Sequence, residues 1–318
     1  MIPNNVVQIK FRKFLFLISF TLTLKAMSIH KVWWSRVFPP ARQIFLLGNA
    51  LYRQFLYPRC NITSASPRIA RCLSSFRVRK RFYKNAGIQE AEGGFQITVD
   101  NKRVKTPAGN PLIVPTKPLA MAVAVEWNSQ KETIKPENMH LTSLSNTVID
   151  NPQTKAPDEQ ILQILEYLNS DTVCFFADEP KELVDLQMKE WKPLVEWFGE
   201  RYRVSIKPST GLLIAVPDEA IDRLKDYLSP LNKWSLAGLE FAVETLKSFI
   251  LAMALIDNCL NVERAVSLSR LELEFQISRW GSVEWAHDLE LMETRSRVAA
   301  AALFYSLNDR HRTLSTHP

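Results

Sequence analysis

A run of eight consecutive apolar residues, Phe249–Ile256, constrains the fold more than any other stretch of the chain. It belongs to a longer segment, residues 235–258, which is predicted to form one helix that is apolar on all sides in its second half. Such a helix is stable in water only when other elements surround it. The run is too short for a membrane span, which needs about 20 apolar residues. The sequence therefore predicts a central buried helix with other helices packed around it.

Four further stretches carry apolar residues at three- and four-residue spacings, which predicts amphipathic helices. Thr116 is a suitable N-cap for the first of them, and a proline in its first turn costs no hydrogen bond. Pro193 is expected to kink or divide the third. The predicted helices are residues 117–127, 158–169, 182–203 and 218–228.

The part of the chain before these helices has the pattern of β structure. Residues 95–99 alternate between apolar and polar, and Asp100 with Asn101 follows as a turn. Further short strands are predicted at residues 81–84, 104–106 and 111–114. Together they would make a small antiparallel unit, covered by the first amphipathic helix with Trp127 as its largest side chain.

The best domain boundary lies at residues 151–157, where two prolines with polar neighbours cannot continue a helix or a sheet. We therefore predict an α+β fold. A small β-rich N-terminal domain with one covering helix would occupy residues 79–150, and a mainly α-helical C-terminal domain would follow at residues 151–308. Residues 309–318 are expected to be a disordered tail. The pattern assigns no secondary structure to residues 141–150.

Charge sets the beginning of the chain apart. Residues 1–89 hold 16 of the 40 Lys and Arg residues and no Asp or Glu, whereas the remainder holds 24 bases and all 33 acids, a net charge of −9. An acid-free segment rich in Arg and Ser is typical of an organelle transit peptide. We therefore expect residues 1–78 to be a transit peptide and disordered lead, cleaved near residues 68–75. The acidic remainder disfavours nucleic-acid binding, which needs a basic face.

An apolar run at residues 14–24 leaves the true start of the chain open. It follows Lys10, Arg12 and Lys13 and resembles the core of a secretory signal. Secretion would leave about fifty further acid-free residues unexplained, because a signal peptide is removed after a short segment. Met27 is an alternative start site, from which a more ordinary transit peptide would follow. Import into an organelle is therefore the expectation.

Residues 271–290 carry the densest functional signal. Asn261 is a suitable N-cap for a helix whose apolar stripe ends at Trp280, and Gly281 stands where helices commonly end in a left-handed residue. Ser282 is a suitable cap for a second helix. The apolar stripe of that helix consists of Ala286, Leu289, Met292, Ala299 and Leu303. The pattern predicts a helical hairpin that closes the bundle, with Trp280 mainly in the core.

The predicted hairpin is strongly acidic. Six carboxylates lie between residues 271 and 294, against one base, Arg279. Most acidic runs on helices are only solvated, and Glu274 can pair locally with Arg270, so this reading stays open. Tryptophan among the carboxylates favours a partner surface, because binding hot spots are enriched in it. The residues expected to bind a partner are Glu272, Glu274, Glu284, Trp285 and Asp288.

Motifs of catalysis and of cofactor binding are missing from the sequence. It contains no GxxxxGK[ST], GxGxxG, GxSxG or HExxH pattern, and its four cysteines lack the spacing of a zinc site. His287 and Asp288 are the one pair of catalytic type, but adjacent residues on a helix point about 100° apart. We therefore expect a protein that is not an enzyme and has no cofactor and no metal. The alternative is an organelle hydrolase or transferase that uses His287 and Asp288.

Five motifs, in a constant order along residues 79–307, resemble a known family. They are RFYK at 81–84, GGFQITVDNKRVKTPAGNPLIVPT at 93–116, AVEWNSQ at 124–130, LTSLSNTVID at 141–150 and LELEFQISRWGSVEWAHDLE at 271–290. They are similar to the mitochondrial ATP synthase assembly factors, of the assembly factor 2 type, that chaperone the α subunit of the catalytic head.

The resemblance implies a matrix protein, at most loosely associated with the inner membrane, without stable membrane insertion and without a nucleic-acid partner. Its partner would be the unassembled α subunit, whose exposed subunit interface is apolar and prone to aggregate until assembly covers it. Carboxylates around Trp285 would attract basic side chains and set the register of binding. An RNA-binding module is a further alternative, which the net charge of −9 disfavours.

Overall fold

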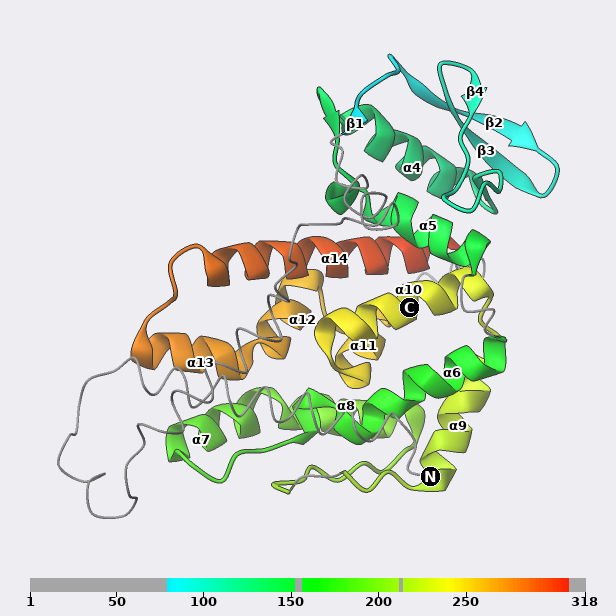
Figure 1. The fold of residues 1–318 in the computed structure, drawn as a ribbon. Helices are drawn as coiled ribbons and strands as arrows, with labels where there is room; N and C mark the ends of the chain where they lie inside the picture. The colour runs from blue at the N-terminus through cyan, green and yellow to red at the C-terminus, as the bar shows by residue number, and fades with distance from the viewer. Residues whose placement is uncertain (1–78, 152–155, 212–213, 309–318) are drawn as a thin grey trace, which may run out of the picture. The chain divides into compact units, whose positions relative to one another are not determined.

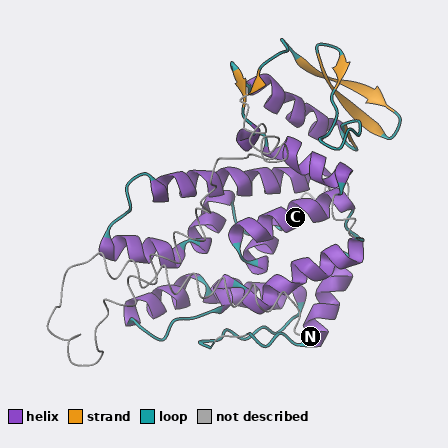
Figure 2. Cartoon of the chain, in the orientation of Figure 1, coloured by secondary structure: helices purple, strands orange, loops and turns teal. Residues whose placement is uncertain are grey.

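A computed structural model describes residues 79–151, 156–211 and 214–308 (Figure 1). The predicted transit peptide, the apolar run at residues 14–24 and the predicted tail lie outside the described residues. The described residues form an α+β fold, in which short strands come first and helices follow (Figure 2). The predicted fold class is thereby confirmed.

The main sheet has four antiparallel strands. Its order is β2-β3-β4, with β5 also paired to β3. The hairpin of β2 and β3 runs in continuous register from Ala86 opposite Val99 to Ala91 opposite Gly94. A separate two-stranded sheet pairs β1 with β6. The strands are β1 Arg79–Lys80, β2 Ala86–Ala91, β3 Gly94–Val99, β4 Lys102–Arg103, β5 Ile113–Val114 and β6 Thr133–Ile134.

The prediction of a strand at residues 81–84 is wrong, because these residues connect β1 to β2 and belong to neither strand. The sequence of β2, AGIQEA, contains one branched residue, so it carries little strand propensity of its own. Pairing with the buried strand β3 determines its conformation. Asp100 and Asn101 form the predicted turn, and both have positive φ.

Two helices complete this part of the chain, α4 (Lys117–Ser129) and α5 (His140–Asp150). Thr116 caps α4 as predicted, because its hydroxyl accepts from the Leu119 amide at 3.4 Å. A 3₁₀ turn, Pro136–Asn138, precedes α5. Helix α5 covers residues 141–150, to which the sequence pattern assigns no structure.

Helices make up most of the chain beyond residue 156. The predicted helix at 182–203 is divided at Trp191, shortly before Pro193, and the helix at 218–228 has the predicted bounds. The helices are α6 Pro157–Glu166, α7 Lys181–Glu190, α8 Lys192–Tyr202, α9 Asp218–Leu228, α10 Lys233–Leu246, α11 Phe249–Ile256, α12 Val262–Ser269, α13 Leu271–Trp280 and α14 Ala286–Asn308, with 3₁₀ turns at Tyr167–Ser170 and Thr172–Cys174.

The apolar run forms helix α11, and all eight of its residues are buried, as predicted. The prediction of one helix over residues 235–258 is wrong, because the chain turns between α10 and α11. Lys247 adopts a left-handed conformation with φ of 55°, and the Ser248 hydroxyl accepts from the Leu251 amide at 3.0 Å. The buried carboxylate of Asp171 accepts from the Ile250 amide at 3.0 Å. A second helix can therefore begin inside the core with its first amides satisfied.

Apolar side chains gather in two cores. The larger one lies among the helices around α11, and the smaller one lies between the main sheet, α4 and α5. Helices α10 and α14 belong to both, since Trp234 and Phe304 contribute to the smaller core with their ring centroids 6.0 Å apart. No helix among the described residues is long and apolar enough to cross a membrane.

Candidate partner-binding surface

Helices α12, α13 and α14 form the region predicted as an acidic hairpin. Asn261 caps α12 as predicted, but the chain bends at Arg270, so the first predicted helix is two helices. Gly281 ends α13 with φ of 83°, as expected. Ser282 does not begin the next helix, because α14 starts at Ala286. Residues 281–285 therefore form a connection between α13 and α14.

The buried side chain of Arg270 holds the two sides of the hairpin together. Its Nε lies 3.2 Å from a carboxylate oxygen of Glu274 on α13, and its Nη1 lies 3.3 Å from one of Glu290 on α14. Two carboxylates thus lie within ion-pair distance of one buried guanidinium, whose fixed fork suits such a position. Glu274 therefore has the local partner that its spacing from Arg270 predicts, while its side chain stays half exposed.

Glu272 points toward α7 and away from the solvent. The side-chain Nε2 of Gln187 donates to the Glu272 carboxylate at 2.8 Å. The side-chain Oε1 of Gln187 accepts from the Ala177 backbone amide at 2.8 Å. Burial raises the pKa of Glu272, and the hydrogen bond from Gln187 partly offsets this shift. A second contact between these helices joins Arg279 to Glu182 at 3.3 Å. Helix α13 is therefore anchored on α7 through polar side chains.

Glu284, Trp285 and Asp288 are exposed at the start of α14. The side chain of Trp285 is 72% exposed, and its backbone has φ of 69°, which is unfavourable for a bulky residue. Among the described residues, neither Glu284 nor Asp288 has an ion-pair partner. These three side chains are thus available to a partner.

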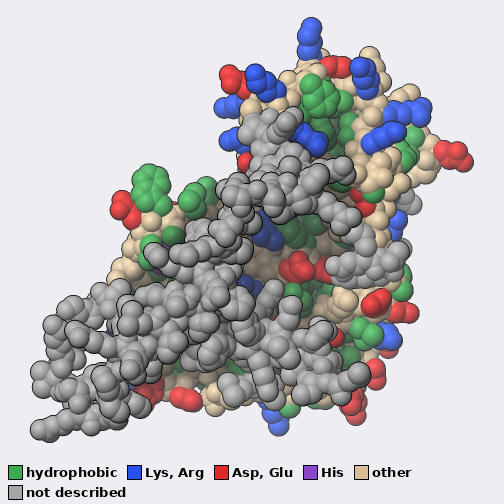
Figure 3. Space-filling model, viewed as in Figure 1, with side chains coloured by type: hydrophobic (Ala, Val, Ile, Leu, Met, Phe, Trp, Pro, Cys, Tyr) green, Lys and Arg blue, Asp and Glu red, His purple; other side chains and the backbone are tan. Residues whose placement is uncertain are grey.

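The apolar stripe predicted for α14 faces the solvent. Leu289 is 66% and Met292 63% exposed, and Leu303 is exposed as well. The side of α14 that packs into the cores carries Val298, Ala301, Phe304 and Tyr305. Figure 3 shows hydrophobic and acidic side chains gathered together at the beginning of α14. Helix α14 therefore closes the bundle as predicted, mainly against α10, but it packs there through the side opposite this stripe.

Trp280 extends the exposed apolar surface from the end of α13. It is 54% exposed, so its predicted place in the core is wrong, and Val283 in the connection is exposed too. Sequence periodicity identifies the side of a helix that is apolar but does not reveal whether another element covers it. We call Trp280, Val283, Trp285, Leu289 and Met292 the hairpin surface.

His287 has a structural position near the start of α14. Its Nδ1 accepts from the Val283 amide at 3.2 Å, which fixes the connection against the helix. This contact gives His287 a structural role between the connection and α14. The ring nitrogen that a neighbouring carboxylate would have to orient in a catalytic pair is already used by the backbone.

The motifs of the N-terminal part hold the fold together. The Glu126 carboxylate accepts from the amides of Leu141 and Thr142, both at 2.8 Å, and so caps α5, whose own N-cap residue makes no side-chain hydrogen bond. Asn128 exchanges two hydrogen bonds with the backbone of Ala86. Asp150 accepts from Thr106, Ala108 and Asn110. These polar side chains bind backbone and neighbouring loops of the same chain.

Glu126→Ala is expected to lower the free energy of unfolding by about 2 kcal/mol, because two amides and the Thr142 hydroxyl lose their acceptor. Urea titration followed by circular dichroism measures this change. Glu126→Gln keeps one carbonyl acceptor and should lose less, and Glu137→Ala, at an exposed acid nearby, should be neutral. Equal stability of Glu126→Ala and the wild type would contradict the capping role.

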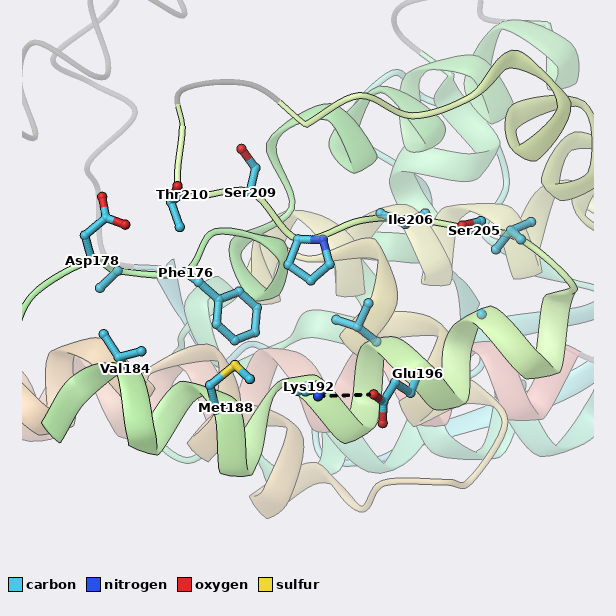
Figure 4. A pocket seen from close by; sticks show the side chains of 15 residues that line it. Phe176, Asp178, Val184, Met188, Lys192, Glu196, Ser205, Ile206, Ser209 and Thr210 are labelled. Atoms are coloured by element: carbon cyan, nitrogen blue, oxygen red, sulfur yellow. Dashed lines mark ion pairs between the residues drawn. The ribbon is translucent and has the colours of Figure 1, made fainter. Parts of the chain in front are cut away.

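A pocket of about 620 Å³ opens between α7, α8 and residues 204–210. Its lining is mostly apolar, and the side chains of Phe176 and Met188 lie next to each other in it (Figure 4). Three charged residues line it, and two of them, Lys192 and Glu196, pair with each other at 3.8 Å, while the third is Asp178. Among the residues that line it, none forms a nucleophile with an adjacent base. The described residues contain no group of three His, Cys, Asp or Glu side chains that could hold a metal.

Known proteins are similar to this chain in sequence and in fold. The family model of the ATP12 chaperone protein matches residues 80–199. Protein atp12, mitochondrial, of Schizosaccharomyces pombe is 31% identical over 251 residues, which cover 75% of this chain and 86% of that protein. Protein ATP12, mitochondrial, of Saccharomyces cerevisiae is 27% identical over 273 residues, which cover 71% and 84%. Both names agree with the predicted mitochondrial location, which is thereby confirmed.

The solved structure of Atp12 from Paracoccus denitrificans has a similar fold. It superposes with a TM-score of 0.66 at 29% identity and covers 73% of this chain and 99% of its own. Sequence motifs, architecture and relatives therefore agree. The chain belongs to the ATP12 chaperone family, the mitochondrial ATP synthase assembly factors that its motifs resemble.

Proposed function

We propose that this chain binds the unassembled α subunit of the ATP synthase catalytic head in the mitochondrial matrix and shields its subunit interface until assembly. The observation that carries the proposal is the hairpin surface, where five large apolar side chains are exposed near Glu284 and Asp288, for which the described part of the chain provides no ion-pair partner. Contiguous exposed apolar surface on a folded chain commonly marks a binding site. The membership of the chaperone family supports a protein as the ligand.

The arrangement suits a contact that is strong enough to form and weak enough to release. Trp280 and Trp285 supply the buried area of aromatic anchors once a partner covers them. Glu284 and Asp288 stay at the rim, where they speed association with a basic partner and contribute only modest affinity. A chaperone that leaves its client during assembly requires this balance.

The five predicted binding residues take different parts in this proposal. Trp285 is the apolar anchor, and Glu284 and Asp288 are the charged contacts, because all three are exposed. Glu274 shares Arg270 with Glu290, and Glu272 is bound to Gln187, so their first role is to hold α13 in place. A partner reaches Glu274 through its exposed half. Glu272→Lys is therefore expected to destabilise the packing of α13 on α7 as well as to weaken binding.

Reversing the two free charges tests the electrostatic part of the proposal. The double variant Glu284→Lys with Asp288→Lys is expected to bind the α subunit about tenfold more weakly at low salt, since each rim charge contributes a factor of about two to five. The difference should shrink at high salt. Binding of purified α subunit to the immobilised mature chain, by surface plasmon resonance, measures both values.

Asp226→Lys on α9 is the matched control, because it reverses an equally exposed acid away from the hairpin. It should leave binding unchanged. Unaltered capture of the α subunit by the double variant would exclude the acidic rim as a contact. Equal weakening by Asp226→Lys would show that net charge alone matters.

A further inference from the structure

The exposed side of α14 repeats with the period of a helix-pairing seam. Its residues follow one another at alternating spacings of four and three, which place them in one stripe along the helix. The stripe consists of Leu289, Met292, Ser296, Ala299 and Leu303, all of them exposed, and the exposed Trp285 lies in the connection just before the helix. A surface that binds a loop or a flat part of a partner does not require apolar residues at alternating spacings of four and three. The repeat therefore fits a second helix laid along α14.

The size of the side chains along the stripe favours close approach of another helix. Large residues stand at both ends, whereas Ser296 and Ala299 stand in the middle. Small residues at the centre let two helix backbones come near each other, while the large ones fill the space on either side. From Leu289 to Leu303 the stripe spans roughly 21 Å at 1.5 Å per residue, which matches about four turns of a partner helix.

The residues beside the stripe indicate the charge of the partner helix. Asp288 and Glu293 flank its first half, and Glu284 lies just before it. Glu293 has only a loose contact, at 3.7 Å, with Arg297 on its own helix. Carboxylates at these flanking positions pair with Lys or Arg on a neighbouring helix and reject a helix with acidic flanks. They also disfavour an anionic membrane surface as the ligand.

We infer that the α14 stripe receives an amphipathic helix of the client, with an apolar seam flanked by Lys or Arg. This inference rests on the proposed function, because it specifies the part of the client that the hairpin surface holds. The client helix takes the place that a further helix of the bundle would otherwise occupy. It packs its apolar seam on Leu289 and Met292, and its basic flanks meet Asp288 and Glu293.

Synthetic helices of three heptads test the inference directly. One peptide has leucine at the seam and lysine at the flanking positions, a second has glutamate at the flanking positions, and a third carries a central proline in the lysine peptide. Fluorescence anisotropy of the labelled peptides is measured with the full mature chain. The lysine peptide is expected to bind at least about tenfold more tightly than either of the others.

Substitutions in the chain identify the binding face. Met292→Glu is expected to weaken binding of the lysine peptide at least tenfold, while Met121→Glu, at a methionine of α4 that is 54% exposed, should leave it unchanged. Equal binding of the three peptides, or no effect of Met292→Glu, would overturn the inference. So would a Met292-dependent binding to vesicles of phosphatidylcholine and cardiolipin without binding to the lysine peptide.

Capture of the α subunit separates this inference from the proposed function. If Met292→Glu weakens capture of the α subunit but no peptide binds the wild-type chain, the helical ligand is wrong and the proposed function stands. If Met292→Glu leaves capture unchanged, the hairpin surface is not the client site, and the proposed function fails at this surface together with the inference.

Discussion

Trp285→Gly is expected to weaken binding of the α subunit about thirtyfold or more while the chain stays folded. Truncation of a central tryptophan in an interface commonly costs about 2 kcal/mol or more of binding free energy. The free chain, in contrast, has little to lose, because this side chain is 72% exposed. Its backbone has φ of 69°, a conformation that glycine adopts without the steric cost of a bulky residue.

Two measurements on the same variant distinguish a binding residue from a structural one. The free energy of unfolding, from urea titration, should stay within about 1 kcal/mol of the wild type, since glycine relieves the backbone but adds entropy to the unfolded chain. Trp285→Phe keeps an aromatic anchor and should retain most of the binding. Loss of stability in parallel with loss of binding would contradict the assignment, as would full binding by Trp285→Gly.

Asp171→Ala is expected to have the largest effect on stability, a loss of about 3 kcal/mol in the free energy of unfolding. The side chain is fully buried, and its two oxygens accept from the amides of Val173 at 3.2 Å and Ile250 at 3.0 Å. Alanine would leave these two buried amides without their acceptor, one in the 3₁₀ turn Thr172–Cys174 and one at the start of α11. Urea unfolding at neutral pH measures the loss.

The pH dependence of the same site has a definite sign. Burial raises the pKa of Asp171 from 3.8 to about 6, against the opposing effect of its hydrogen bonds. The folded chain therefore binds this proton more tightly than the unfolded chain does. The stability contributed by the protonated group is fully present below about pH 4 and is lost as the pH rises to about 6.

Asp171→Asn removes this titration and keeps the shape of the side chain. The stability of the wild type relative to this variant should fall by about 2 kcal/mol between pH 4 and pH 6, because the slope approaches about 1.4 kcal/mol per pH unit only midway between the pKa values of the unfolded and the folded chain. Urea titrations of both chains over this range give the difference. A difference that is constant with pH, or that rises with it, would contradict the raised pKa.

Patterns that depend on neighbours in the sequence predict the fold well. The caps at Thr116 and Asn261, the end of a helix at Gly281 and the bounds of α9 all follow from local chemistry. The missed end of α10, inside the predicted helix at residues 235–258, has a long-range cause. The turn at Lys247 depends on Asp171, which lies far away in the sequence and satisfies the amides of the next helix. Local periodicity contains no information about such a partner.

The exposure of the hairpin surface could not be predicted either, because it also depends on contacts between residues far apart in the sequence. Leu289, Met292 and Leu303 have the spacing of a core face, and the sequence alone predicts that they are buried. Their exposure follows from the packing of the opposite side of α14, around Phe304, into the cores. Glu272 could not be distinguished from Glu284 and Asp288 either, because Gln187 reaches it only in the folded chain.

Helix α14 has a consequence for how sequence variants in this family are interpreted. One side of the helix carries the exposed stripe, and the other side of its last turns is built into the smaller core, where the Thr116 hydroxyl donates to the Leu307 carbonyl at 2.9 Å. The proposed client site and the β-rich part are thus connected by one helix. A substitution that loosens the packing around Trp127 is then expected to cause an assembly defect, although that residue lies among the fold-holding motifs. Loss of chaperone activity in the cell is therefore no proof that the altered residue touches the client.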